Sequence, residues 1–256
     1  MSDKYLSYHL YYNSDYFEIV KEIHTILAQY NVFGVHYKDN KGYHVRIRIK
    51  NEAIFCDSKN ILLEKLNKIN NIVDIIENVY YAENERYGED NIEIIERLFE
   101  LFTKLIYQII SDSDKWKYEN SLFMSLAVNM AFLNSFNNER FIFECLKDGF
   151  QGWLPYALYL TNDDSQRLIE LFKQKFQNDL SNWRKVEKVK TFISEEFDNY
   201  FSEIKEIYTK IIMQNNADKL IEITSSIIHM NHNRFGIYNR DEAYMFFVLN
   251  KLCKKN

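Results

Sequence analysis

The sequence is poor in residues that break or link secondary structure, with one proline and six glycines among 256 residues. No glycine- and serine-rich linker and no low-complexity tract is therefore expected. The three cysteines, Cys56, Cys145 and Cys253, are odd in number, far apart and outside any Cys-x-x-Cys pattern. This pattern indicates neither a disulfide framework nor a zinc site. Hydrophobic residues make up 46% of the chain, which is enough for a substantial core.

Long apolar runs and excess positive charge are also missing. No uncharged apolar stretch of about 18 residues occurs, and the first residues lack a basic region followed by an apolar run, so a cytoplasmic protein without a membrane span is expected. The net charge of −5 argues against a protein that mainly neutralises a nucleic-acid backbone. The Gly-x-Gly-x-x-Gly, Walker, Gly-x-Ser-x-Gly and His-Glu-x-x-His motifs are all absent.

Strand and helix patterns alternate in the first third of the chain. Strands are predicted at 5–12, 32–37, 42–50 and 72–81, and helices from Asp15 and at 59–70. This order is the split β-α-β plan, in which an antiparallel sheet carries helices on one face and leaves the other face free.

Beyond Gly88 the pattern becomes helical. Helices are predicted at 92–110, 119–134, 139–147, 165–180, 187–214, 217–230 and 241–251. The predicted fold class is α+β, with a small ferredoxin-like sheet in residues 1–88 packed against a larger helical part in residues 89–256. We expect both parts to form a single domain over 1–256.

The stretch from Gly42 to Lys50 is predicted to be a strand with two different faces. Because successive strand residues point to opposite faces, one face carries apolar residues and the other carries His44, Arg46, Arg48 and Lys50. Two arginines spaced two residues apart present donors that suit carboxylates, phosphates or an oxyanion. The alternative is the solvated face of an antiparallel sheet.

A second group of charged residues, Glu83 to Gly88, follows the last predicted strand. Side chains at strand ends are often functional, because a rigid scaffold holds them exposed. The plain alternative is a solvated charge patch of little energetic weight. If Arg86 instead faces the same pocket as Arg46 and Arg48, three cations converge, and Glu83 or Glu85 is needed to hold them.

A third group lies near the end of the chain, at Ile227 to Gly236. His229 is predicted in the last turn of a helix, where the negative end of the helix dipole favours a protonated ring that can transfer protons. The alternative is a buried histidine satisfied by the backbone. His232 follows three residues later, but no third ligand is near, so a metal site is not indicated.

Aromatic residues suggest two further interpretations. Lys41-Gly42-Tyr43 is similar to the start of an RNA-recognition signature, but Val45 and Ile47 stand where stacking rings should follow, which disfavours RNA binding. The aromatic residues of the helical part are expected in the core rather than on a peptide-binding platform; they are Phe141, Phe143, Trp153, Tyr156 and Tyr159.

Taken together and in this order, the three groups resemble a known family. The matching stretches are Tyr43-His44-Val45-Arg46-Ile47-Arg48, Glu83-x-Glu85-Arg86-Tyr87-Gly88 and Ile228-His229-Met230-x-x-Asn233-Arg234-x-Gly236. They look like the C-terminal elimination domain of lantibiotic (class I lanthipeptide) dehydratases, a family that includes stand-alone proteins of thiopeptide-type bacteriocin biosynthesis. The resemblance spans nearly the whole chain. Since a glutamyl-transfer domain has no room in 256 residues, the resemblance implies the separate lyase of a split system.

The resemblance implies a reaction and its participants. The substrate would be a serine or threonine of a ribosomally made precursor peptide with a leader, already glutamylated by a separate tRNA-dependent enzyme. Loss of glutamate would give dehydroalanine or dehydrobutyrine, with no metal and no organic cofactor. The implied catalytic residues are Arg46, Arg48, Glu83, Arg86 and His229. The implied substrate contacts are His44, Tyr87, Asn233 and Arg234. We expect the guanidinium groups of Arg46 and Arg86 and the imidazole of His229 to line one cavity.

Two departures from the family pattern leave other functions open. The family commonly continues Tyr-Gly-Gly and has an Asp-Ser pair in the next helix, where this sequence has Tyr87-Gly88-Glu89 and Phe102-Thr103. Thiopeptide pyridine synthases resemble the same domain, but they join two dehydroalanines by a formal [4+2] cycloaddition and then expel water and the leader. A third possibility is a catalytically silent partner that binds a precursor by strand addition or helix docking.

Overall fold

The computed structural model describes residues 4–50, 56–113, 116–136 and 138–254. It falls into two units, Met1–Lys117 (unit 1) and Tyr118–Asn256 (unit 2), and each is described by itself. Unit 1 contains β1 (Tyr5–Tyr12), α1 (Tyr16–Leu27), β2 (Val32–Asp39), β3 (Gly42–Lys50), α2 (Cys56–Leu66), β4 (Ile72–Asn78), α3 (Asn84–Tyr87) and α4 (Ile92–Ser111). Unit 2 contains α5 (Tyr118–Asn134), α6 (Glu139–Thr161), α7 (Ser165–Asn178), α8 (Leu180–Glu196), α9 (Asp198–Gln214), α10 (Ala217–Arg234) and α11 (Asn239–Cys253).

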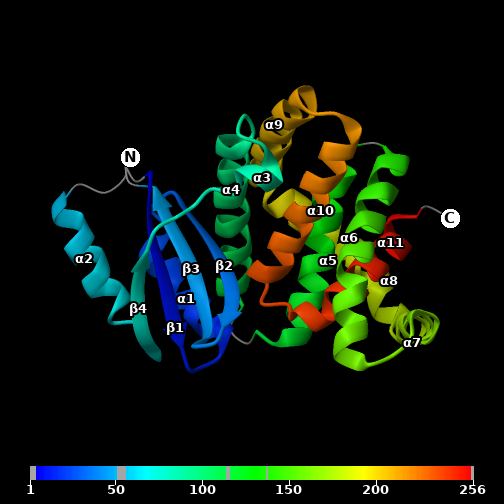
Figure 1. Ribbon diagram of the computed structural model, residues 1–256, viewed down its shortest axis with the longest axis horizontal. Helices are drawn as coiled ribbons and strands as arrows, with labels where there is room; N and C mark the ends of the chain where they lie inside the picture. Colours follow the sequence, from blue (N-terminus) through cyan, green and yellow to red (C-terminus); the bar gives the residue numbers. More distant parts are fainter. Residues whose placement is uncertain (1–3, 51–55, 114–115, 137, 255–256) are drawn as a thin grey trace. The chain divides into compact units, whose positions relative to one another are not determined.

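Unit 1 is built around one antiparallel sheet in the order β2-β3-β1-β4 (Figure 1). The predicted order of strands and helices is confirmed, and with it the α+β class. Asp15 caps α1 by accepting a hydrogen bond from the backbone N–H of Phe17 at 2.8 Å, which explains why this helix begins where the sequence predicts. The fourth strand ends at Asn78, three residues earlier than predicted.

The two sheet faces separate apolar from polar side chains. Val45, Ile47 and Ile49 of β3 are fully buried on the face against which α1 packs its own buried residues. Tyr43 has the same parity but lies by the hairpin turn and stays 36% exposed. The alternation predicted for β3 is thus confirmed for the interior of the strand.

The opposite face, which carries the arginines and is called the polar face below, is not free as predicted. Tyr5 and Phe33 are buried at one end of it, where their rings pack edge-on against Tyr80 with centroids 5.5 and 5.6 Å away. Phe99 of α4 lies 5.9 Å from Phe33. The segment after β4 therefore folds back over this end of the face, which alternation along the strands alone does not reveal.

Helix α4 closes the β2 edge of the sheet. Thr103 accepts a hydrogen bond from the backbone N–H of Gly34 at 3.0 Å and donates its own proton to the carbonyl of Phe99 at 2.7 Å. A Cβ atom on Gly34 would lie 2.2 Å from the hydroxyl oxygen of Tyr107, so only glycine permits this approach. Phe102-Thr103, where the family resemblance leads one to expect Asp-Ser, thus helps to anchor the edge strand.

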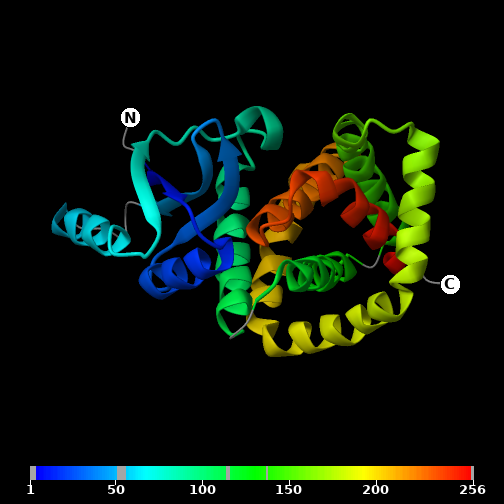
Figure 2. The same ribbon diagram turned by 90° about the horizontal axis from the view of Figure 1, so that it is seen from below.

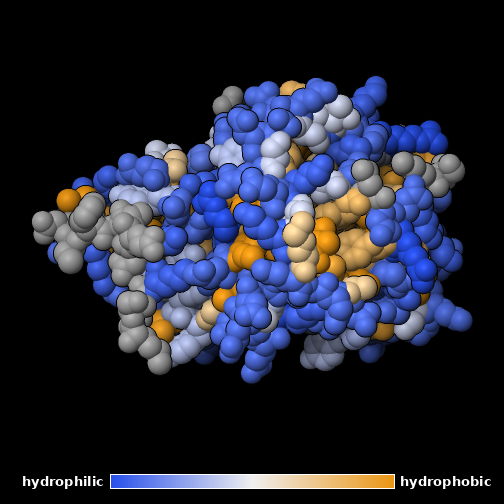
Figure 3. All heavy atoms as spheres, turned by 90° about the horizontal axis from the view of Figure 1, so that it is seen from above, coloured by the Kyte–Doolittle hydropathy of each residue, from blue (hydrophilic) through white to orange (hydrophobic). Residues whose placement is uncertain are grey.

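Unit 2 consists of helices, with α5 in the middle of the others (Figure 2). The predicted helix at 139–147 is too short, since α6 continues to Thr161 through two glycines and Pro155. Gly149 is required there because a Cβ would lie 2.2 Å from the ring of Phe246 in α11. The predicted single helix at 187–214 is also wrong, because Phe197 separates α8 from α9. No helix in the described ranges is long and apolar enough to cross a membrane, and hydrophilic side chains cover most of the face in Figure 3.

Candidate active site

The arginines of β3 lie on the polar face among aromatic and imidazole rings. The register places His9 of β1 opposite Arg46, and Phe33 of β2 opposite Arg48. The guanidinium carbon of Arg46 stands 3.5 Å from the ring centroid of Tyr37, a close cation–π contact. Arg46 thus has a fixed position on a face that is partly open to solvent.

His44 is fully buried beside Arg46, and its contacts indicate its protonation state. The Nε atom of Arg46 donates to Nε2 of His44 at 3.2 Å, so Nε2 must be an acceptor. The proton then belongs on Nδ1, which lies 3.3 Å from the carbonyl of Gly42. Burial lowers the pKa of His44, in agreement with a neutral ring. His44 positions Arg46, and with no exposed surface its predicted role as a substrate contact stays a prediction.

Two other histidines of unit 1 also have lowered pKa values. Burial, followed by the charge of Arg46, lowers the pKa of His9 to about 4, and its ring stacks on that of His44 with centroids 4.9 Å apart. Burial lowers the pKa of His36 to about 4, and this ring stacks on Tyr16 at 4.3 Å. Both rings are neutral in the folded protein near pH 7.

These values predict a specific loss of stability in acid. The ordinary histidine pKa is 6.5, so the unfolded chain takes up protons at His9 and His36 between pH 6.5 and 4 while the folded protein does not. The free energy of unfolding should therefore have its full value above pH 6.5 and fall as the pH drops to 4. Urea unfolding at pH 7.0 and 4.5 measures this fall. The double variant His9→Gln, His36→Gln should show a smaller fall, and an equally steep one would contradict the assignment.

Arg48 differs from Arg46 because one of its donors is buried and unused. Its Nε atom has no hydrogen-bond partner among the described residues, and its guanidinium carbon lies 5.7 Å from the Phe33 ring and 5.5 Å from the Tyr80 ring. Burial, followed by Arg46, lowers the pKa of Arg48 to about 10, so the group remains charged near neutral pH. A cation with a buried, unused donor costs free energy unless an anion approaches it.

The second motif lies on α3 and the residue before it. Arg86 donates to Glu83 at 3.2 Å, and both side chains are about half exposed. Glu83 also acts on Arg48, since its negative charge opposes the lowering of the Arg48 pKa. Glu83 therefore connects Arg86 with the arginines of the sheet. Tyr87 is buried, with its ring 5.6 Å from that of Phe99, and its role as a substrate contact stays a prediction.

The third motif forms a hydrogen-bonded cluster in unit 2. Nδ1 of His229 lies 3.0 Å from one carboxylate oxygen of Glu242, and Nδ1 of His232 lies 2.6 Å from the other. If both rings donate through Nδ1, Nε2 of His229 is the atom left to accept a proton. The side-chain nitrogen of Asn233 lies 3.1 Å from that Nε2. His229 is partly exposed, whereas His232 and Glu242 are fully buried.

Glu242 is the residue of this cluster that sequence reasoning missed. It lies in the first turn of α11 beside Asp241, directly before the apolar run that starts at Ala243, and a carboxylate next to that run was the available signal. Burial alone would raise the pKa of Glu242, but His232 and His229 together lower it overall. The carboxylate is therefore charged at neutral pH and fixes the orientation of both rings.

The structure predicts a large effect of removing this charge. Glu242→Gln should lower the free energy of unfolding by about 3 kcal/mol, because the ring N–H groups of His229 and His232 lose the charged acceptor that they share. Glu222→Gln, on the exposed side of α10 next to Lys219, is the matched control and should change it by less than about 1 kcal/mol. Urea unfolding near pH 7 measures both, and equal effects would contradict the role of Glu242. Since its pKa is lowered from 4.5, the contribution of Glu242 should be lost as the pH falls below 4.5.

The surroundings of the cluster correct three expectations. Helix α10 continues to Arg234, so His229 is not in its last turn, and Glu242 rather than the helix dipole supports its ring. Arg234 is fully buried and donates to Asn231 at 3.3 Å, so its role as a substrate contact stays a prediction. Asn233 is the substrate contact predicted in this motif that remains partly exposed.

The aromatic residues of α6 were also predicted incorrectly in part. Tyr159 is 82% exposed, Tyr156 40% and Phe143 37%, so these rings are not in the core. Trp153 is partly exposed, and its ring lies 4.6 Å from that of His229. For Tyr156 and Tyr159 the error follows from Gly149 and Pro155, which hid the continuing helix and therefore the direction in which these side chains point. Phe143 lies inside the helix that was predicted, on its exposed side.

The predicted catalytic residues thus fall into two clusters. Arg46, Arg48, Glu83 and Arg86 lie in unit 1, and His229 lies in unit 2. That the two clusters line one cavity stays a prediction. Among the described residues no group of three or more His, Cys, Asp or Glu side chains is arranged to hold a metal ion.

Comparison with known proteins identifies the family. The model of the family described as "Lantibiotic biosynthesis dehydratase C-term" matches residues 6–253. The chain belongs to this lantibiotic dehydratase C-terminal family. Membership connects the protein with the maturation of ribosomally made peptide natural products, in a family of peptide-modifying enzymes. A search of curated proteins finds no match.

Two solved structures share the fold of this lantibiotic dehydratase C-terminal protein. The tRNA-dependent lantibiotic dehydratase MibB from Microbispora sp. 107891 is 13% identical with a TM-score of 0.65, covering 99% of this chain. This chain spans only 28% of the length of MibB. The pyridine synthase TbtD from thiomuracin biosynthesis is 10% identical with a TM-score of 0.60, covering 98% of this chain and 97% of TbtD. At these identities the comparison establishes the fold.

Proposed function

We propose that this protein is a lyase that eliminates glutamate from glutamylated serine or threonine residues of a ribosomally made precursor peptide. The product would be dehydroalanine or dehydrobutyrine. Membership in the lantibiotic dehydratase C-terminal family supports this class of reaction. The observation that carries the choice of elimination is the unsatisfied Nε donor of Arg48 on the same sheet face as Arg46.

Elimination generates negative charge at two places. Removal of the α-proton produces an enolate-like oxygen, and breaking the bond between Cβ and the ester oxygen releases glutamate as a carboxylate. Guanidinium groups fixed in a partly dehydrated site stabilise such charge as it develops. Arg48 has a donor available for this purpose, the charges of Arg46 and Glu83 act on it, and Glu83 in turn binds Arg86.

The α-proton needs an acceptor, and His229 is assigned this role. Glu242 holds the ring through Nδ1, so the α-proton would move to Nε2 while the electrons of the C–H bond form the new double bond. Asn233 would give up its contact with Nε2 when substrate binds. The same ring can afterwards return a proton to the departing glutamate.

Mass spectrometry of a glutamylated peptide tests this function. Incubation with the protein should remove the mass of one glutamic acid for each glutamylated residue, leaving a dehydrated residue that reacts with thiols. The peptide should remain unchanged without protein. A peptide that binds but keeps its glutamate would instead support a catalytically silent peptide-binding partner.

Pyridine synthesis is the second candidate, because this chain and TbtD cover almost all of each other's length. A peptide with preformed dehydroalanines and azoles would then lose water and its leader. This outcome together with no glutamate loss would replace the lyase assignment.

The proposed lyase depends on a second activity. Its substrate must be glutamylated beforehand, so we assign it a separate tRNA-dependent glutamylating enzyme as a partner in the cytoplasm. Purified glutamylating enzyme and this protein should dehydrate a precursor together, and neither should do so alone.

A further inference from the structure

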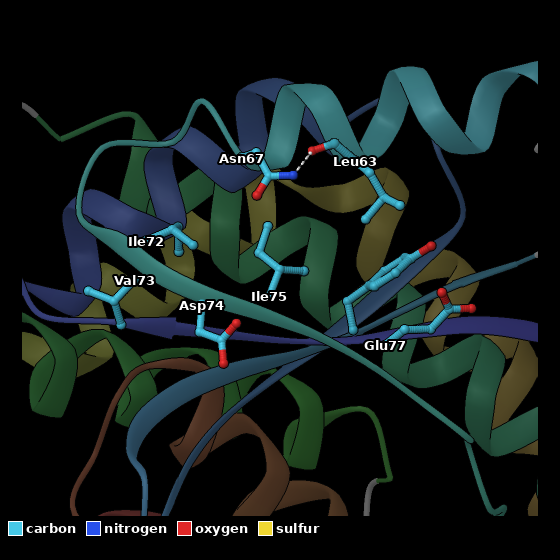
Figure 4. A pocket seen from close by; sticks show the side chains of 8 residues that line it. Leu63, Asn67, Ile72, Val73, Asp74, Ile75 and Glu77 are labelled. Carbon is cyan, nitrogen blue, oxygen red and sulfur yellow. Dashed lines mark hydrogen bonds between the residues drawn. The ribbon is translucent and has the colours of Figure 1, made fainter.

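The edge strand β4 borders a groove that the proposed chemistry does not use. β4 is the last strand in the sheet order, so its outer edge pairs with no described strand. A cavity of about 390 Å³ runs along it, lined by α2, the residue after α2, the strand itself and Tyr8 of β1. In Figure 4 Leu63 and Asn67 stand on the helical side, and Ile72, Ile75 and Glu77 on the strand side.

A separate cavity of about 250 Å³ lies beyond the end of the strand. It shares Glu77 with the first cavity and is also lined by Val79, Tyr81 and Ala82. Val79 is 55% exposed and Tyr81 79%, so apolar surface extends along this path. The seven residues of β4 alone span about 23 Å. An unpaired strand edge of this length, bordered by a cavity, suits an extended chain better than a compact small molecule.

Tyr8 provides an independent sign of a ligand. Its side chain is fully buried, its hydroxyl has no hydrogen-bond partner among the described residues, and it lines the first cavity. Burying a hydroxyl without a partner costs free energy, and burial also raises the pKa of this phenol. A carbonyl of a peptide in the groove would satisfy this donor.

The lining defines the chemistry of the occupant. Leu63, Ile72 and Ile75 form an apolar wall, and Asp74 has the opposite strand parity from Ile75, so its carboxylate lies on the other side of the edge. We propose that β4 binds an extended peptide by strand addition, with apolar side chains at alternate positions and basic side chains between them. Backbone hydrogen bonds to the edge would supply affinity, and the alternation would supply specificity.

This inference goes beyond the proposed function, although the choice of a peptide as the ligand rests on that function. The bound segment would be a part of the substrate peptide other than the residues that react. A short glutamylated peptide without that segment should still be converted by a protein that fails to bind it. Elimination and groove binding can therefore fail separately.

Fluorescence anisotropy with a labelled synthetic peptide tests the groove. The probe has ten residues, with isoleucine and lysine in alternation, and a peptide with the same composition in two blocks is its control. The alternating peptide should bind at least tenfold more tightly than the block peptide. Equal or absent binding would overturn the proposal.

Variants locate the binding on the protein. Leu63→Glu should abolish measurable binding, whereas Ile61→Glu, on the same helix but outside the lining and already 54% exposed, should leave it unchanged. Tyr8→Phe should weaken binding about threefold to tenfold without loss of stability, because its hydroxyl has no protein partner to lose. Identical binding by all three variants would show that the peptide does not bind in this groove. A dimer that forms at high concentration and disappears with Leu63→Glu, without peptide binding, would instead assign the edge to a second copy of the chain.

Discussion

Replacing His229 with glutamine should lower kcat for glutamate elimination about 10³-fold, within the range that general acid–base catalysis contributes. Glutamine keeps a polar side chain beside Glu242 and Asn233, so the packing of α10 should be little changed. The loss would come from the missing proton acceptor. Single-turnover assays with a glutamylated peptide, followed by mass spectrometry, measure it.

The control for this variant is His24→Gln. His24 lies in α1 of unit 1, outside both clusters, so its replacement should leave elimination unchanged. Peptide binding by the His229 variant should also stay near the original value, because the effect is on kcat. A His229→Gln protein that eliminates at the normal rate would remove this residue from the mechanism.

Replacing Arg48 with methionine should reduce kcat/KM for elimination by about 10²-fold to 10³-fold, the usual effect of losing one donor to a developing anion. The same change should leave the free energy of unfolding equal or higher, because it removes a cation whose Nε atom is buried without a partner. Opposite signs of the two effects distinguish a functional arginine from one that supports the fold. Peptide turnover and urea unfolding measure them.

Arg167→Met is the matched control. Arg167 is on α7 with 71% of its side chain exposed, so neither turnover nor stability should change beyond a few tenths of a kcal/mol. If Arg48→Met unfolds the protein, the buried guanidinium is structural and the proposed anion site is wrong. Arg48→Lys should recover only part of the activity, because a lysine cannot reproduce the planar set of donors.

The β-rich part of unit 1 could be predicted closely because its signals are local. Alternation along β3 depends only on strand geometry, and Asp15 marks the start of α1 through its own hydrogen bond. The covering of the polar face could not be predicted, because the residues that cover it come from distant parts of the chain. Tyr80 and Phe99 reach Phe33 from segments about 50 residues away or more.

The residue types of the candidate site could be predicted from the sequence, but the residues that hold them in position could not. His229 was found because it lies in a motif with Asn233 and Arg234, whereas Glu242 is joined to it only by the packing of α11 on the other helices. The same limit applies to Tyr8, whose unused hydroxyl is visible only once β4 and α2 enclose it. Sequence spacing describes neighbours along one element, and these partners come from different elements.

The hydrogen bond from Gly34 to Thr103 has a consequence for self-association. Since α4 occupies the β2 side, only the β4 side of the sheet can accept another strand. Growth of an open-ended filament by strand pairing needs two unpaired strand edges on every molecule. Any accidental pairing between copies through β4 would therefore stop at a closed two-fold pair.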